Sequence, residues 1–121
     1  MRTPSDEFLR DVAITAVEGG VNYWARIEGY RWRGKTGAEL PWPVIELVEL
    51  DDCGTPVSVH TLTKDAVKLA VLAILASQVS INETLFNTLL KAVEEDDAGM
   101  VDAELADCVV QVALFNEIVY G

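Results

Sequence analysis

The amino-acid sequence predicts a single α+β domain over residues 1–121, in which a three-stranded antiparallel sheet packs against about four helices in the order α-β-β-β-α-α-α. Two observations predict this fold class. Side chains alternate with a two-residue period between residues 21 and 62, and apolar residues recur at three-and-four spacing on both sides of that region. With 121 residues, 50% of them apolar, the chain is large enough to bury one core without metals or cross-links.

A first helix is expected over residues 6–18. Ser5 is a suitable N-cap, and the two acids that follow it lie where carboxylates interact favourably with the helix dipole. The pair Gly19-Gly20 is expected to end this helix, because glycine adopts the left-handed conformation that closes helices without steric cost.

Strands are expected over residues 21–33, 44–50 and 57–62, separated by turn-forming residues at 34–37 and 51–56. Short connections of this kind favour an antiparallel meander. Strict alternation in the first strand predicts that one face carries Trp24, Arg26, Glu28, Tyr30 and Trp32.

Three helices are expected in the second half of the chain. Thr63 can cap a helix that is apolar on almost every side and is therefore expected at the centre of the core. Asn82 can cap a second helix, which ends in the acidic run of residues 94–97. A last helix is expected over residues 101–119.

The charge balance limits the classes of partner. Nine Lys and Arg against 20 Asp and Glu give a net charge of −11, which disfavours double-stranded nucleic acid and anionic membranes and favours a partner with a basic surface. The longest apolar run, residues 66–79, is too short to span a bilayer, and the N-terminus lacks the apolar segment of a signal peptide. We therefore expect a cytoplasmic protein whose Cys53 and Cys108 are reduced thiols.

Four of the nine cationic residues lie within residues 26–35, interleaved with aromatic residues. Aromatic rings can stack on a base and arginine can pair with phosphate, so this strand is a candidate site for a nucleotide or another small anion. Its candidate residues are Trp24, Arg26, Tyr30, Arg31, Trp32 and Arg33. The alternative is ordinary cross-strand packing, in which glutamates of the next strand neutralise the arginines.

A second candidate surface is acidic and would bind a basic protein. It comprises Glu94, Glu95, Asp96, Asp97, Asp102 and Glu104, with Asp107 beyond them. Four acids at the end of a helix oppose its dipole, so helix stability alone does not explain them. The alternative is a solvated helix end. The acids lack the spacing of a calcium-binding loop, so no metal site is expected.

The sequence offers no catalytic signature. His60 is the only histidine, neither cysteine belongs to a CxxC motif, and nucleophile-elbow and phosphate-loop motifs are absent from the sequence. We therefore expect a protein without catalytic residues or cofactors.

Two segments carry a resemblance to a known family. Residues 15–20 followed by Tyr23-Trp24-Ala25, and the tail of residues 106–121, resemble an uncharacterised family of small acidic proteins of actinobacteria and their phages and plasmids. This sequence has Asn116 where that family has glycine. The resemblance implies a non-enzymatic accessory or counter-defence protein that inhibits a partner by binding it. The apolar end of the chain, residues 115–120, is expected either in the core or at a homodimer contact.

Overall fold

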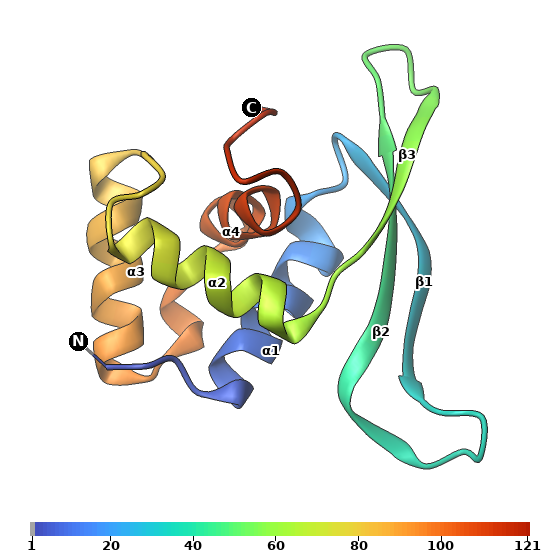
Figure 1. The fold of residues 1–121 in the computed structure, drawn as a ribbon, viewed down its shortest axis with the longest axis horizontal. Coiled ribbons are helices and arrows are strands. Elements are labelled where there is room, and N and C mark those ends of the chain that lie inside the picture. Colours follow the sequence, from blue (N-terminus) through green and yellow to red (C-terminus); the bar gives the residue numbers. More distant parts are fainter. Residues whose placement is uncertain (1) are drawn as a thin grey trace.

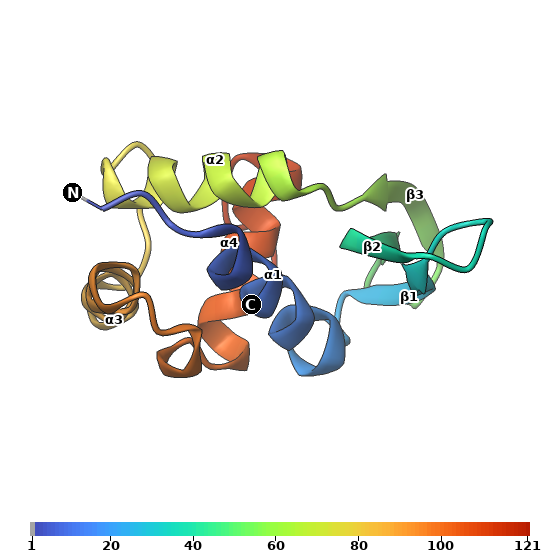
Figure 2. The ribbon, with the colours of Figure 1, turned by 90° about the horizontal axis from the view of Figure 1, so that it is seen from below.

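The computed structural model describes residues 2–121 and confirms the predicted α+β fold and element order. The elements are α1 (Asp6–Thr15), η1 (Ala16–Gly20), β1 (Ala25–Arg33), β2 (Glu39–Leu50), β3 (Pro56–Thr61), α2 (Lys64–Leu75), α3 (Glu83–Glu95), η2 (Ala98–Met100) and α4 (Ala103–Phe115). The sheet is antiparallel with β2 in the middle, and all the helices lie on one side of it (Figures 1 and 2). The opposite face of the sheet is therefore not covered by any helix.

Sequence-local capping explains where the helices begin. The side chains of Ser5, Thr63, Asn82 and Asp102 each accept a hydrogen bond from a backbone N–H in the first turn of the helix that follows. The caps predicted at the first three of these residues are confirmed.

The core lies between the sheet and the helices, and α4 is at its centre. Helix α4 packs against α1, η1 and α2, and seven of its residues are buried. Helix α2, which we predicted to be central, lies instead at the surface of the helical layer (Figure 2). Its Leu69 is 67% exposed. Its nearly continuous apolar sequence suggested more burial than the fold provides.

The junction between α1 and β1 differs from the prediction. The helix does not end at Gly19-Gly20 through a left-handed residue but continues as the π-helical turn η1, in which the N–H of Val21 donates to the carbonyl of Ala16 at 3.1 Å. Gly20 is needed for another reason. A Cβ atom at that position would lie 2.7 Å from the carbonyl oxygen of Ala103, so only glycine lets η1 approach α4 this closely.

A β-bulge in β1 overturns the predicted alternation of side chains. Ile27 pairs with Leu47 and Gly29 pairs with Glu46, so Glu28 is an extra residue without an opposite partner. Side chains that follow the bulge therefore point to the face opposite the one expected. The residues predicted to share one face are therefore divided between the two faces of the sheet. Arg26 lies on the uncovered face.

The last helix is shorter than the predicted 101–119. Helix α4 ends at Phe115, because Asn116 adopts a left-handed conformation with φ of 61° and donates its N–H to the carbonyl of Val112. Asparagine is one of the few residues besides glycine that tolerates this conformation. The remaining residues, 116–121, form a tail that folds back over the domain.

Candidate functional site

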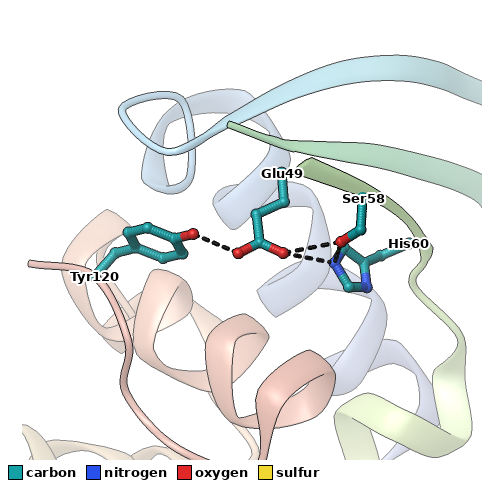
Figure 3. A network of polar contacts seen from close by, with 4 residues as sticks. All are labelled: Glu49, Ser58, His60 and Tyr120. Atoms are coloured by element: carbon teal, nitrogen blue, oxygen red, sulfur yellow. Dashed lines mark hydrogen bonds and ion pairs between the residues drawn. The ribbon is translucent and has the colours of Figure 1, made fainter. Parts of the chain in front are cut away.

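A polar cluster lies where the tail meets the sheet (Figure 3). Glu49 of β2 is opposite Ser58 of β3, and His60 follows two residues later on the same face. The Glu49 Oε1 atom accepts from Ser58 Oγ at 3.0 Å and lies 3.1 Å from His60 Nε2, and its other oxygen accepts from the hydroxyl of Tyr120. The neighbouring strand β3 and the distant tail thus converge on one carboxylate of β2.

The cluster shifts the titration of both Glu49 and Tyr120. The hydrogen bond from Tyr120, followed by those from His60 and Ser58, outweighs the effect of burial and lowers the pKa of Glu49 below its usual value. The same bond to Glu49 raises the pKa of Tyr120 to about 12. An ionised glutamate and a neutral tyrosine are therefore the forms that stabilise this contact at neutral pH.

The geometry differs from that of a serine–histidine–acid catalytic triad. In such a triad the acid binds one imidazole nitrogen and the serine binds the other. Here Nε2 of His60 faces both Ser58, at 2.8 Å, and Glu49. The imidazole also packs edge-on against Phe115, with ring centroids 5.3 Å apart. This arrangement anchors the tail, and no relay from acid through imidazole to hydroxyl is formed.

A second network centres on Asp107 of α4, which is buried. Its carboxylate accepts from the hydroxyl of Tyr23 at 2.6 Å, from Nε1 of Trp24 at 2.7 Å and from Nε2 of Gln111 at 3.1 Å. The Tyr23 residue is largely exposed, but partial burial of its hydroxyl, and then the bond to Asp107, raises the pKa of that hydroxyl. We had placed Asp107 with the acidic surface residues; the structure corrects this, because the carboxylate is enclosed by its three donors.

Gln111, fully buried, fastens the tail to the domain. Its Oε1 atom accepts from the backbone N–H groups of Val119 and Tyr120 at 2.8 and 2.7 Å, and its Nε2 donates to the carbonyl of Tyr120 at 3.1 Å. The ring of Tyr120 stacks on Trp24, with centroids 5.2 Å apart and planes 3° from parallel. The apolar end is thus part of the core at Phe115 and Tyr120, while Val119 is half exposed.

The predicted ligand residues of β1 do not form one group. Trp24 is buried beneath Tyr120, and Arg26 pairs with Glu28 at 2.6 Å on the uncovered face. Tyr30 packs against the core. The guanidinium of Arg10 from α1 lies 6.0 Å above the ring of Trp32, which therefore faces the helices.

The two remaining arginines of that prediction are exposed. Arg31 lies on the uncovered face, opposite Val44, and Arg33 donates to the carbonyl of Gly37 at 3.0 Å near the tip of the hairpin. The structure therefore brings together Tyr30 and Trp32, whose ring centroids are 6.1 Å apart, and separates this pair from Trp24 and Arg26.

The predicted acidic residues lie together around the end of α3, the turn η2 and the start of α4, and all six are exposed. Asp97 caps η2 and Asp102 caps α4, so these two acids favour the helices that follow rather than opposing α3. Asp96 adopts the left-handed conformation that ends α3 and accepts from Ser5 Oγ at 2.8 Å. Helix capping thus explains half of the acidic residues and leaves the other half without such a role.

Glu94, Glu95 and Glu104 have no such role. Glu95 forms one long, exposed ion pair, with Lys91 at 3.9 Å, and within residues 2–121 the carboxylates of Glu94 and Glu104 form no ion pair or hydrogen bond. We call these three side chains the free acidic surface. Together they form the part of the acidic group that is available to a partner.

Other features of residues 2–121 give little chemistry. No three His, Cys, Asp or Glu side chains in that range converge as metal ligands would, and no helix there is long and apolar enough to cross a membrane. Both cysteines are free, and burial raises the pKa of the Cys108 thiol to about 11, which keeps it protonated at neutral pH. An apolar pocket of about 320 Å³ lies between β2 and the start of α2, beside Trp42 and Thr61.

Sequence reasoning missed the residues that hold the tail. Glu49 lies on the core-facing side of β2, as do Ile45 and Leu47. Gln111 interrupts the run of valines in α4. A polar residue at a position predicted to be buried was the available signal, because such a group must find hydrogen-bond partners. The partners themselves, Tyr23 and Tyr120, are distant in sequence.

Comparison of the chain with models of known protein families, with curated proteins and with solved structures gives no match.

Proposed function

We propose that this protein is a non-enzymatic binding protein whose free acidic surface engages a basic surface of a protein partner. The observation that carries the proposal is the position of Glu94, Glu95 and Glu104. These three exposed carboxylates lie on the end of α3 and the start of α4 and have no capping role. Rigid elements present such charges at a fixed spacing, which favours a specific complementary surface over diffuse attraction.

The overall charge supports the same proposal. With a net charge of −11, the chain attracts cationic molecules over distances of about 8 Å at physiological salt. Four of the cations are gathered on β1 and its hairpin, at the other end of the molecule from α3 (Figure 1). The helical end is therefore the more strongly acidic one. The accessory or counter-defence role that the family resemblance implies is consistent with function through binding alone.

The test compares two variants of equal charge. The substitutions Glu94→Gln, Glu95→Gln and Glu104→Gln raise the net charge from −11 to −8 and leave the helix caps intact. The matched control replaces Glu39, Glu83 and Glu117, which are also exposed, with glutamine. Titration calorimetry against a panel of small basic proteins measures the affinity of each variant.

The first variant is expected to bind the basic proteins about ten-fold more weakly than the wild type, because each interfacial charge contributes several tenths of a kcal/mol or more. The control is expected to lose less than about three-fold. Equal losses in the two variants would show that net charge alone governs binding, and the proposal would then be wrong.

A further inference from the structure

The outer edge of β3 carries backbone groups without partners. Leu62 donates its N–H to the carbonyl of Ile45 at 3.0 Å, and residues of an antiparallel strand direct their backbone groups alternately toward and away from the neighbouring strand. Ser58 and His60 therefore face β2, whereas Val59 and Thr61 direct their N–H and C=O groups away from the sheet. Nothing in the described chain, residues 2–121, forms a strand or a backbone hydrogen bond along this edge.

The two edges of the sheet differ in how they are protected. Natural sheets prevent strand addition at an edge with charged residues and bulges. The edge strand β1 has both, namely the bulge at Glu28 and the charges of Arg26, Arg31 and Arg33. Strand β3 contains no Asp, Glu, Lys or Arg, and its register shift lies near its start, between Pro56 and Ser58, so its pairing is regular from Ser58 to Thr61. The edge of β3 is therefore open to another strand over these four residues.

The side chains of β3 also suit strand addition. Val59 points to the uncovered face of the sheet and is 67% exposed, and Val57, at the register shift, is 57% exposed. On the opposite face, Glu49 holds Ser58 and His60 in place. A strand added at the edge would cover the two valines with its own side chains and leave the core unchanged.

Charge selects the class of occupant. Asp51 and Asp52 lie in the exposed turn before β3, and Glu46 is opposite Thr61 at its other end. A second copy of the chain would bring the same acids against these, which is unfavourable. A strand that carries lysine or arginine would instead be attracted by the acids at both ends of the edge.

We propose that β3 binds an extended segment of a partner protein, in which Lys or Arg alternates with β-branched residues, as an added fourth strand. This inference rests on the proposed function, since it specifies how a basic partner is engaged. It adds a second contact, made of main-chain hydrogen bonds, to the contact with the free acidic surface. The apolar pocket beside Thr61 adjoins the end of this edge and offers space for one apolar side chain of the same segment.

The probe for this proposal is a capped peptide in which lysine alternates with valine. Its binding is followed by amide hydrogen exchange of the protein. We expect added protection at Val59 and Thr61. Two further peptides have the same sequence but are methylated on the amide nitrogen of every second residue. One version blocks one edge of the peptide strand, and the other version blocks the opposite edge. One of the two versions is expected to bind at least ten-fold more weakly, because it cannot form the ladder although its charge is unchanged.

The matching protein variant is Val59→Pro. The N–H that proline lacks at this position is one that β2 does not use. The sheet of the variant is therefore expected to fold, because edge strands tolerate proline where the N–H would face solvent. We expect the lysine–valine peptide to bind this variant at least ten-fold more weakly, whereas Val59→Thr, which keeps the N–H, is expected to bind within about three-fold of the wild type. If Val59→Pro fails to fold, the methylated peptides decide the matter on the wild-type protein.

Three results would overturn the inference. The first is equal binding of the plain and both methylated peptides, which would indicate attraction by charge alone. The second is absence of binding at low salt. The third is protection of Val59 and Thr61 that rises with protein concentration without peptide, which would assign the edge to a second copy. None of these results depends on Glu94, Glu95 and Glu104, so failure of the inference is distinguishable from failure of the proposed function.

Discussion

Replacement of Asp107 by alanine tests whether the buried network of α4 stabilises the fold. The substitution removes three hydrogen bonds, from Tyr23, Trp24 and Gln111. The most costly consequence is at Trp24, whose indole N–H would be buried without an acceptor. The other two donors keep alternatives, because the Tyr23 side chain is exposed and Gln111 still reaches the carbonyl of Tyr120.

The magnitude follows from these contacts. An unsatisfied buried donor costs about 1–3 kcal/mol, and each hydrogen bond to a charged group contributes about 1.5–3 kcal/mol. The carboxylate has no cationic partner, so its removal also relieves a desolvation cost. We expect Asp107→Ala to lower the free energy of unfolding by about 3 kcal/mol and the Tm by about 10–15 °C. Asp107→Asn keeps the shape and one acceptor, and is expected to cost about 1 kcal/mol.

Chemical denaturation and calorimetry measure the two stabilities, and NMR provides a local readout. The indole N–H of Trp24 is expected to exchange slowly in the wild type and in Asp107→Asn, and much faster in Asp107→Ala. A loss below about 1 kcal/mol in Asp107→Ala would refute the reasoning, because it would mean that the three hydrogen bonds do not outweigh the burial of a charge.

Three further predictions concern the glycine pair, alkaline pH and nucleotide binding. Gly20→Ala is expected to lower the free energy of unfolding, measured by thermal denaturation, by about 1–3 kcal/mol, since its Cβ would lie 2.7 Å from a carbonyl oxygen. Gly19→Ala has nothing within 4 Å of the added Cβ, so it is expected to leave that free energy unchanged or to raise it. Because the pKa values of Tyr23 and Tyr120 are raised in the folded state, stability is expected to fall as the pH rises from 10 to 12, and less steeply in the Phe variants; a flat profile would contradict this. Millimolar nucleotides are expected to leave the tryptophan fluorescence unchanged, because the aromatic rings of β1 face the helices; a saturable change would support a site there.

The parts of the fold that could be predicted are those fixed by neighbours in sequence. Ser5, Thr63 and Asn82 cap helices because each side chain reaches a backbone N–H two or three residues ahead. The strands could be predicted because the alternation of side chains is visible in the sequence of each strand by itself. Such signals need no knowledge of the rest of the chain, and they were sufficient for the element order.

The features that could not be predicted depend on contacts across the molecule. The bulge at Glu28 reverses the faces of Tyr30 and Trp32, and only the pairing of β1 with β2 reveals it. The reason for Gly20 is the approach of α4, more than 80 residues later in the chain. The candidate ligand site on β1 depended on strict alternation, and one inserted residue was enough to disperse its side chains.

The two polar networks explain why the chain has both a rigid interior face and an open edge on the same sheet. Glu49 fixes the inward side chains of β3, and the bonds from Gln111 to the tail keep Tyr120 in contact with Glu49. The register of β3 is thereby set from within, without a neighbour on its outer side. An edge strand positioned in this way needs no ordering when another strand pairs with it, so the entropy cost of binding falls mainly on the partner segment. This preorganisation is the physical reason to expect strand addition at β3 rather than at the bulged and charged edge of β1.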